Sequence, residues 1–298
     1  MYKGFSYSVT GASHVVKNLV CQDSSAHFAA ENYSIAVVAD GHGSKKHFRS
    51  NIGSRLAVEC TLEVIKRFYA DAEEFNRQFP ANHKRIMRNI ERQIISEWNT
   101  KINEHFLVNP LTDVEKNQFE EGELSEIPVE SYYGTTLVAA VMNHDFTFGF
   151  QIGDGSLIAV FEDGFTSMLI DYEESNPANI TASMCNSNAI SMFNSYYVDN
   201  KKIDAVFVST DGLYTSFGSD LEFLNYHAII ADQLSESELF ADTVNKNIQK
   251  RTNYGTQDDI SLSCVYNPEL LRANSDAIKN RIEENKRRLL SRKPKPKK

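Results

Sequence analysis

Four carboxylates of this chain stand beside short apolar segments, an arrangement that can build a metal site. Asp40 follows a strand-like apolar run and is followed by Gly-His-Gly, and Asp211 follows another such run and precedes a glycine. Asp258 comes shortly before a third strand-like segment, and Asp23 directly before a fourth. Carboxylate oxygens and a backbone carbonyl, such as that of Gly41, are the ligands that hard divalent cations prefer. Without a Cys/His cluster, this set favours Mg²⁺ or Mn²⁺ over zinc.

Each of these acidic residues also has an ordinary structural interpretation. Asp-Gly pairs are common in turns, so Asp23 taken alone fits a turn or a cap better than a ligand. The repetition of the pattern favours a functional interpretation for Asp40 and Asp211. Asp154, between two glycines, fits a turn and a supporting role in the site equally well. Four histidines, His47, His83, His105 and His227, lack zinc-ligand spacing, and we expect them at the surface or within helices.

The composition is that of a folded chain of one or two domains. Its 298 residues are 41% hydrophobic and 24% charged, which is enough to bury a large core. The N-terminus has no basic segment followed by an apolar one, and no apolar run approaches the roughly 20 residues that span a bilayer. We therefore expect a cytoplasmic protein with no membrane association. The four cysteines are widely spaced, which argues against a disulfide framework.

Charge is distributed unevenly along the chain. The net charge is -9, but residues 285–298 carry eight basic side chains and no acidic one, so residues 1–284 carry -17. An acidic body makes nucleic acid an unlikely main ligand, because counterion release needs a positive face. The basic tail is either a solvated end or a segment that docks to an acidic partner, to the protein's own acidic loop or to nucleic acid.

Strand-like and helix-like segments occur in blocks without an internal repeat. The expected strands are residues 5–10, 24–30, 33–39, 135–142, 146–152, 157–161, 205–209 and 260–265, and the expected helices are residues 48–69, 86–106, 221–234 and 236–250. We expect residues 135–161 to form an antiparallel meander, residues 109–130 a surface loop, and residues 172–197 an irregular segment. This order predicts an α+β fold with a two-layer antiparallel β-sandwich flanked by helices on both sides.

Six motifs, in this order, resemble the metal-dependent protein phosphatases of the protein phosphatase 2C type, nearest to their bacterial branch. They are Cys21-Gln22-Asp23, Asp40-Gly41-His42-Gly43, Gly134-Thr135-Thr136, Gly153-Asp154-Gly155, Ser209-Thr210-Asp211-Gly212 and Asp258-Asp259-Ile260. The resemblance covers residues 4–266. It implies a catalytic domain over residues 1–267, followed by a helical, basic C-terminal tail over residues 268–298, and a two-metal site at one end of the sandwich.

The resemblance also implies a role for each metal-binding residue. Asp40 would bridge both cations, and Gly41 would bind one of them through its carbonyl. Asp211 and Asp258 would complete the other ion, while Asp23 would act on the Gly41 side, directly or through water. Several negative ligands are needed to offset the repulsion between two divalent ions roughly 3.5–4 Å apart.

Two questions about the metal site concern which acidic residues take part in it. For the Asp258-Asp259 pair we expect the first to be the ligand, because the family places it there, and Asp259 to be a structural hydrogen-bonding residue. A third metal, known in some relatives, needs an acidic residue just before Gly134. Glu130 is one residue out of step, so the third site stays open.

The implied reaction is hydrolysis of phosphoserine and phosphothreonine in proteins. Water shared by two Mn²⁺ or Mg²⁺ ions would lose its proton near neutral pH and attack phosphorus as hydroxide. His42 would then protonate the leaving alkoxide, which is a poor leaving group without an acid. The alternative is a catalytically weak or silent relative that acts as a phosphoprotein-binding or regulatory module.

One departure from the family pattern concerns the substrate phosphate. Many members carry an arginine five residues before the counterpart of Asp23, and this chain has Asn18 there, with Lys17 adjacent and His14 nearby. We expect these three residues to contact the phosphate. A lysine binds phosphate as a point charge and not as a fork, so substrate affinity or orientation would differ.

Overall fold

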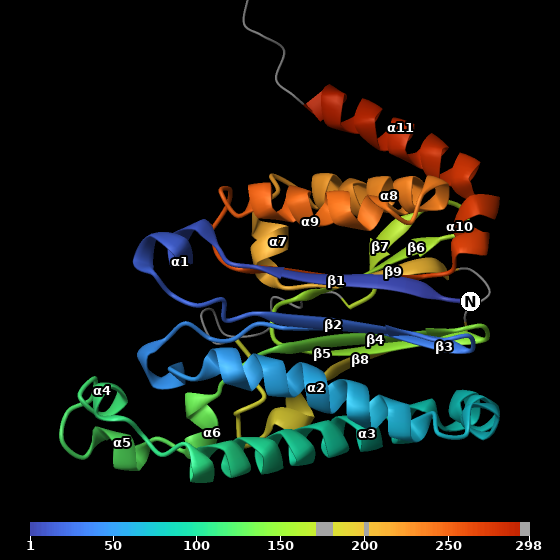
Figure 1. The fold of residues 1–298 in the computed structure, drawn as a ribbon. Coiled ribbons are helices and arrows are strands. Elements are labelled where there is room, and N and C mark those ends of the chain that lie inside the picture. Colours follow the sequence, from blue (N-terminus) through green and yellow to red (C-terminus); the bar gives the residue numbers. More distant parts are fainter. Residues whose placement is uncertain (171–180, 200–202, 293–298) are drawn as a thin grey trace, which may run out of the picture.

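Two five-stranded antiparallel sheets face each other between two layers of helices (Figure 1). The computed structural model describes residues 1–170, 181–199 and 203–292. The first sheet contains, in spatial order, β1 (Lys3–Val9), β10 (Ile260–Tyr266), β9 (Ile203–Ser209), β6 (Ser156–Phe161) and β7 (Thr166–Met168). The second contains β2 (Ser24–Ala29), β3 (Tyr33–Ala39), β4 (Leu137–Asn143), β5 (Phe146–Ile152) and β8 (Asn194–Asp199). The predicted fold class is confirmed.

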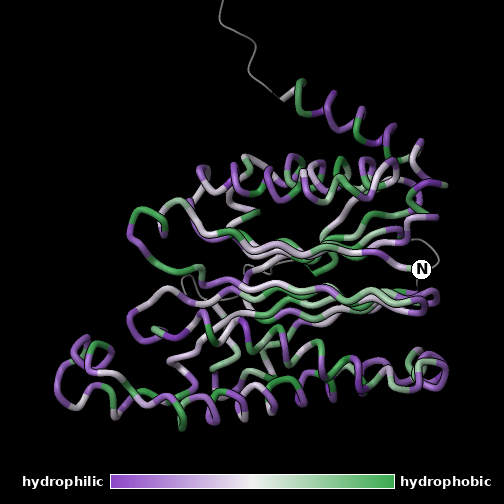
Figure 2. The backbone as a smooth tube through the Cα atoms, in the orientation of Figure 1, coloured by the Kyte–Doolittle hydropathy of each residue, from purple (hydrophilic) through white to green (hydrophobic). Residues whose placement is uncertain are grey.

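The central strands are apolar on both faces because each lies between the other sheet and a helical layer. β4, β5 and β9 are buried at every residue. Small side chains such as Ala36 and Val38 of β3 meet Val206 and Val208 of β9 in the layer between the sheets. β-branched residues fit such a pleated, covered surface well. Figure 2 shows the hydrophilic colouring concentrated on the outer helices, with the strands mostly intermediate or hydrophobic.

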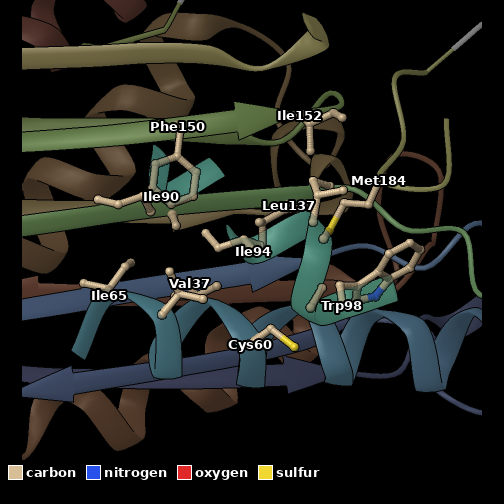
Figure 3. Packing of buried hydrophobic residues seen from close by; sticks show 14 of the residues in the cluster. Val37, Cys60, Ile65, Ile90, Ile94, Trp98, Leu137, Phe150, Ile152 and Met184 are labelled. Carbon is tan, nitrogen blue, oxygen red and sulfur yellow. The ribbon is translucent and has the colours of Figure 1, made fainter. Parts of the chain in front are cut away.

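The helices α2 (Ser50–Phe68) and α3 (Ala72–Val108) cover the second sheet, as the sequence predicted. Ile90, Ile94 and Trp98 of α3 are fully buried, and Figure 3 shows Ile90 beside Phe150 of β5 and Trp98 near Met184. Burying each such side chain stabilises the fold by about 1.5–3 kcal/mol. These side chains, which recur every four residues along α3, therefore belong to the core. The helix begins well before the expected residue 86 and continues through an internal proline.

The helices α8 (Asp220–Glu236) and α9 (Phe240–Arg251) cover the first sheet. Two further helices, α10 (Pro268–Ala273) and α11 (Ser275–Arg292), pack outside α8. Leu271, Ile278 and Ile282 from these helices are buried in one apolar cluster with residues of α8 and of the first sheet. The segment after residue 267 is thus helical and joined to the body by apolar packing. Residues 293–298, the last part of the basic tail, lie outside the described part. No helix among the described residues has the length and apolar character that a membrane crossing requires.

The expected meander over residues 135–161 is wrong in its last strand. β4 and β5 pair antiparallel, but β5 has β8 as its other neighbour, and β6 pairs with β9 and β7 in the first sheet. The link between β5 and β6 carries the chain from one sheet to the other. Gly153 has a φ of 104°, which favours glycine, and a Cβ at Gly155 would lie 2.8 Å from the Ser209 carbonyl oxygen.

Two segments expected to be irregular contain regular structure. Residues 109–130 include the short helices α4 (Asp113–Lys116), α5 (Glu123–Glu126) and the start of α6 (Val129–Tyr132), and a capping box between Thr112 and Glu115 begins α4. Helices this short have no periodic signal. Of residues 172–197, those up to 180 lie outside the described part, and the rest includes the 3₁₀ turn η2 (Ala189–Met192) and most of β8. β8 is an edge strand with exposed polar residues, so its alternation is weak.

Candidate active site

A cavity of about 540 Å³ lies at the end of the sandwich where α1 (Ala12–Lys17) and α7 (Asp211–Thr215) are found, at the left in Figure 1. Asp40 follows the end of β3, Asp211 follows the end of β9, and Asp258 precedes β10. β9 and β10 are antiparallel neighbours, so the end of one and the start of the other meet at the same edge. These three of the four predicted carboxylates line the cavity, although they come from distant parts of the chain.

Hydrogen bonds to the main chain hold Asp40 in place. The Asp40 N–H donates to Thr136 Oγ1 (3.1 Å), and its carbonyl accepts from the Thr136 N–H and from Thr135 Oγ1 (both 2.8 Å). These bonds leave the Asp40 carboxylate to the cavity. The two threonines therefore fix the main chain at Asp40.

Gly41 lies where no larger residue fits. Its N–H donates to the Gln22 carbonyl (3.2 Å), and a Cβ would lie 2.5 Å from that oxygen and 2.8 Å from the Ser50 carbonyl. Its place in the cavity wall is compatible with the predicted carbonyl ligand. Gly134 is equally restricted, because a Cβ there would lie 2.4 Å from His47 Nδ1.

The carboxylates of the cavity repel one another. Burial, and then the negative charges of Asp23, Asp211, Asp154 and Asp258, hold the pKa of Asp40 well above its usual range. Burial and the charge of Asp154 raise the pKa of Asp211 to about 6, although a side-chain hydrogen bond with Asp40 opposes the increase. Two ionised carboxylates can only accept hydrogen bonds, so this bond needs a proton between them. A divalent cation can take the place of that proton, and the all-oxygen donor set fits Mg²⁺ or Mn²⁺.

Asp23 lies behind the cavity and is not among the residues that line it. Its carboxylate is buried, and Oδ2 accepts a hydrogen bond from Thr210 Oγ1 at 2.8 Å. Burial raises its pKa, and the charges of Asp259 and Asp211 add to the increase. Of the two binding modes expected for Asp23, this position favours the one through water. Gln22, which sequence reasoning missed, does line the cavity; its place in the same Cys-Gln-Asp motif and its amide oxygen were the available signal.

Asp258 and Asp259 both line the cavity but differ in burial and in their hydrogen bonds. Asp258 has about half of its side chain exposed, whereas Asp259 is buried and accepts hydrogen bonds from the N–H groups of Gly11 (2.7 Å) and Gln22 (2.6 Å). Asp259 therefore holds the N-terminal segment against the site. His14 lies between the pair, with Nε2 3.4 Å from Asp258 Oδ1 and Nδ1 2.9 Å from Asp259 Oδ1. These three side chains lie close enough together to share a cation.

Two histidine rings form another part of the wall. His42 is half-buried, and its ring centroid lies 4.9 Å from that of His47. Burial, followed by the positive charges of His47 and Lys46, lowers the pKa of His42 to about 4. His47 is itself buried, with Nδ1 against the Ser131 carbonyl; of the surface and helix positions expected for it, it has the second, at the end of the 3₁₀ helix η1 (Lys45–His47). Its spacing from His42 gave no signal of this proximity.

Comparison with known proteins identifies the family. A family model described as Protein phosphatase 2C matches residues 10–250. The chain belongs to the protein phosphatase 2C family. A search of curated protein sequences found no match.

Solved structures of this family share the fold at low sequence identity. The serine/threonine phosphatase of S. agalactiae is 17% identical, with a TM-score of 0.55 over 89% of this chain and 99% of that one. The serine/threonine phosphatase Stp1 from Staphylococcus aureus is 16% identical, with a TM-score of 0.56 over 90% and 95%. PppA of Pseudomonas aeruginosa is 18% identical, with a TM-score of 0.54 over 89% and 97%. At these identities the similarity shows the fold alone.

Of the three residues expected to contact the substrate phosphate in this protein phosphatase 2C domain, one lines the cavity and two do not. His14 lines the cavity, but Lys17 and Asn18 do not. Lys17 is an exposed residue of α1, and Asn18 ends that helix with a left-handed φ of 55°. Lys46, which the sequence analysis did not consider, lines the cavity beside His42.

Two further acidic residues were left open by the sequence. Asp154 lines the cavity, and its Oδ2 accepts a hydrogen bond from Thr181 Oγ1 at 3.0 Å, so its side chain joins the Gly153–Gly155 turn to residue 181 at the cavity of this protein phosphatase 2C domain. Glu130 lies in α6 and is not among the residues that line the cavity.

Proposed function

We propose that the protein is a Mn²⁺- or Mg²⁺-dependent phosphatase that hydrolyses phosphoserine and phosphothreonine in proteins. The observation that carries this proposal is the convergence of Asp40, Asp211 and Asp258 on one cavity that also contains His42. Membership in the protein phosphatase 2C family supports the reaction class. Charge repulsion among the carboxylates supports a cationic cofactor, because buried acidic groups without a counter-charge are costly.

The family resemblance supports a role for each residue that would hold the two cations. Asp40 would bind both ions, and the Gly41 carbonyl would bind one of them. Asp211 and Asp258, from the ends of neighbouring strands, would bind the other, and Asp23 would act from behind through water. Bound there, the cations would bring the pKa of water toward neutrality and offset the charge of the phosphoryl group.

His42 is the residue suited to protonate the leaving oxygen. It lies two positions after Asp40, and its ring belongs to the cavity wall. Its lowered pKa means that the imidazole is neutral at pH 7 without substrate. The negative charge of a bound phosphoester favours the protonated ring, so the acid forms in the complex with substrate.

A phosphoprotein-binding module without turnover is the second candidate. The observation in its favour is that the position expected for a phosphate-binding arginine holds Asn18, outside the cavity. The buried acid cluster argues for the enzyme, because a binding module has no need of repelling carboxylates.

Phosphate release from phosphoserine and phosphothreonine peptides, with Mn²⁺ and with EDTA, tests the proposal. Asp211→Asn should reduce turnover by more than about a hundredfold. Mutation of residues that only hydrogen-bond to a metal ligand already reduces metal affinity or activity by about 10–100-fold. Asp204→Asn is the matched control, because Asp204 is also a buried acid of the β9 region but bonds to Asn274 Nδ2 (2.9 Å) outside the cavity. A wild-type protein that binds phosphopeptide and releases no phosphate in Mn²⁺ would favour the binding module.

A further inference from the structure

Permanently positive side chains are rare in the cavity wall. Among the described residues that line it, Lys46 is the only lysine or arginine. Five carboxylates share the same wall, from Asp40, Asp154, Asp211, Asp258 and Asp259. A phosphate group with two negative charges therefore meets one fixed cation of the protein and otherwise acidic or neutral side chains.

Lys46 is available to a ligand, whereas its neighbour is not. Both lysines belong to the 3₁₀ turn η1 (Lys45–His47). Lys45 Nζ lies 2.9 Å from Glu123 Oε2 and 4.5 Å from the centre of the Phe119 ring, so it is turned toward α5. Lys46 is exposed and has no ion pair with a carboxylate in the described part of the chain. These two consecutive lysines therefore differ in their surroundings: Lys45 is paired with Glu123, and Lys46 lines the cavity.

Arg49, the next permanently positive residue along the chain, binds groups outside the cavity. Arg49 is buried, and its Nε lies 2.7 Å from Glu115 Oε1, while Nη1 donates to the Asn109 carbonyl and to Tyr133. This guanidinium fixes the α4 segment to the body and does not line the cavity. Of the three cations between residues 45 and 49, only Lys46 remains for binding.

We propose that Lys46 binds the phosphate group of the substrate. This inference rests on the proposed function and assigns to Lys46 the contact that the sequence analysis expected of Lys17. An ammonium on a flexible stem attracts phosphate as a point charge and does not fix its orientation. Lys46 therefore contributes to binding of substrate and of inorganic phosphate more than to the rate of the bound complex.

The test compares wild type with Lys46→Ala, Lys46→Arg and the matched control Lys45→Ala. KM and kcat are measured on p-nitrophenyl phosphate and on a phosphoserine peptide with Mn²⁺, together with inhibition by inorganic phosphate. Lys46→Ala should raise KM on both substrates, and the inhibition constant of phosphate, by about 10–100-fold, as expected for a lost charge-assisted hydrogen bond. We expect kcat to change by less than about threefold, which is the signature of uniform binding. Lys46→Arg should restore most of the affinity, and Lys45→Ala should resemble wild type.

Two results would overturn the inference. One is a Lys46→Ala protein that matches Lys45→Ala in all these constants. The other is a KM that rises for the peptide alone, since that would place Lys46 against the polypeptide and not against the phosphate. If the wild type has no turnover, the proposed function fails separately, and calorimetric titration of the Mn²⁺-loaded proteins with inorganic phosphate still decides whether Lys46 binds it.

Discussion

Thr210 donates a hydrogen bond to Asp23 between the two sheets, with 2.8 Å from Thr210 Oγ1 to Asp23 Oδ2. Asp23 directly precedes β2 of the second sheet, and Thr210 directly follows β9 of the first. The same hydroxyl accepts a hydrogen bond from the Ser261 N–H at 2.9 Å. Both side chains are buried, so a buried polar network joins the two sheets at the site end of the sandwich.

Replacing this hydroxyl should therefore destabilise the fold. Thr210→Val leaves a buried carboxylate oxygen and a backbone N–H without their partner, and we expect the free energy of unfolding to decrease by about 1–3 kcal/mol. Urea denaturation in EDTA measures the change without a contribution from metal. Thr210→Ser keeps the hydroxyl and should lose less than half as much. Equal losses in both variants would indicate that the methyl group, and not the hydrogen bond, matters.

Asp40→Asn should have opposite effects with and without metal. The pKa of Asp40 is raised in the folded state, so its ionised form costs stability above the unfolded pKa, and the amide removes that cost. In EDTA the variant should melt at a higher temperature than wild type. In Mn²⁺ at 100 times the dissociation constant, wild type should gain about 5–10 °C, and the variant should gain little. A wild type that does not respond to millimolar Mn²⁺ would count against the metal site.

His42→Ala should distinguish substrates by their leaving group. A serine alkoxide needs a proton as it leaves, whereas p-nitrophenolate does not, so turnover of a phosphoserine peptide should decrease by about 10²–10⁴-fold. Turnover of p-nitrophenyl phosphate should decrease much less. His144→Ala is the control, because His144 is exposed in the β4–β5 turn. Equal losses on both substrates would remove His42 from the role of acid.

His227 should make the fold sensitive to mild acid. It is fully buried in α8, where Nδ1 lies 2.9 Å from the Phe223 carbonyl, and burial lowers its pKa from 6.5 to about 4. Between these values the unfolded chain binds a proton that the folded chain does not, so stability falls as the pH falls. At pH 5 this cost is about 2 kcal/mol.

The matching variant is His227→Gln, whose amide can still donate to the Phe223 carbonyl. Its free energy of unfolding, compared with that of wild type at pH 7.5 and pH 5, isolates the titration of this one side chain. The difference between the two proteins should shift in favour of the variant by about 2 kcal/mol on acidification. A difference that does not depend on pH would show that burial does not lower the pKa of His227.

Local sequence patterns were sufficient for most elements and for finding three of the acidic residues that share the cavity. The apolar residues that recur every four positions along α3, and the apolar runs that end at Asp40 and Asp211, are patterns contained within a few residues. Their spacing and order were specific enough to indicate the family and its α+β sandwich. The distinction between Asp258 and Asp259 was also correct in the structural role of the second residue, which binds two backbone N–H groups.

Contacts between distant segments decided the rest. An apolar strand carries no mark of which sheet it joins, so the crossing of β6 to the first sheet depends on the turn around Gly153 and on pairing with β9. The same holds for His227, whose burial is a property of the layer that α8 covers and not of its neighbours in the chain.

The cavity shows the division most clearly. The sequence by itself determined that Asp40, Asp211 and Asp258 are acids at strand ends, because strand and turn propensities act over a few residues. Only the tertiary structure decided that Asp23 lies behind them and that Lys46 lines the cavity while Lys45 faces α5. The direction of a side chain in a short turn is set by what packs around it, and those neighbours are tens of residues away in the chain.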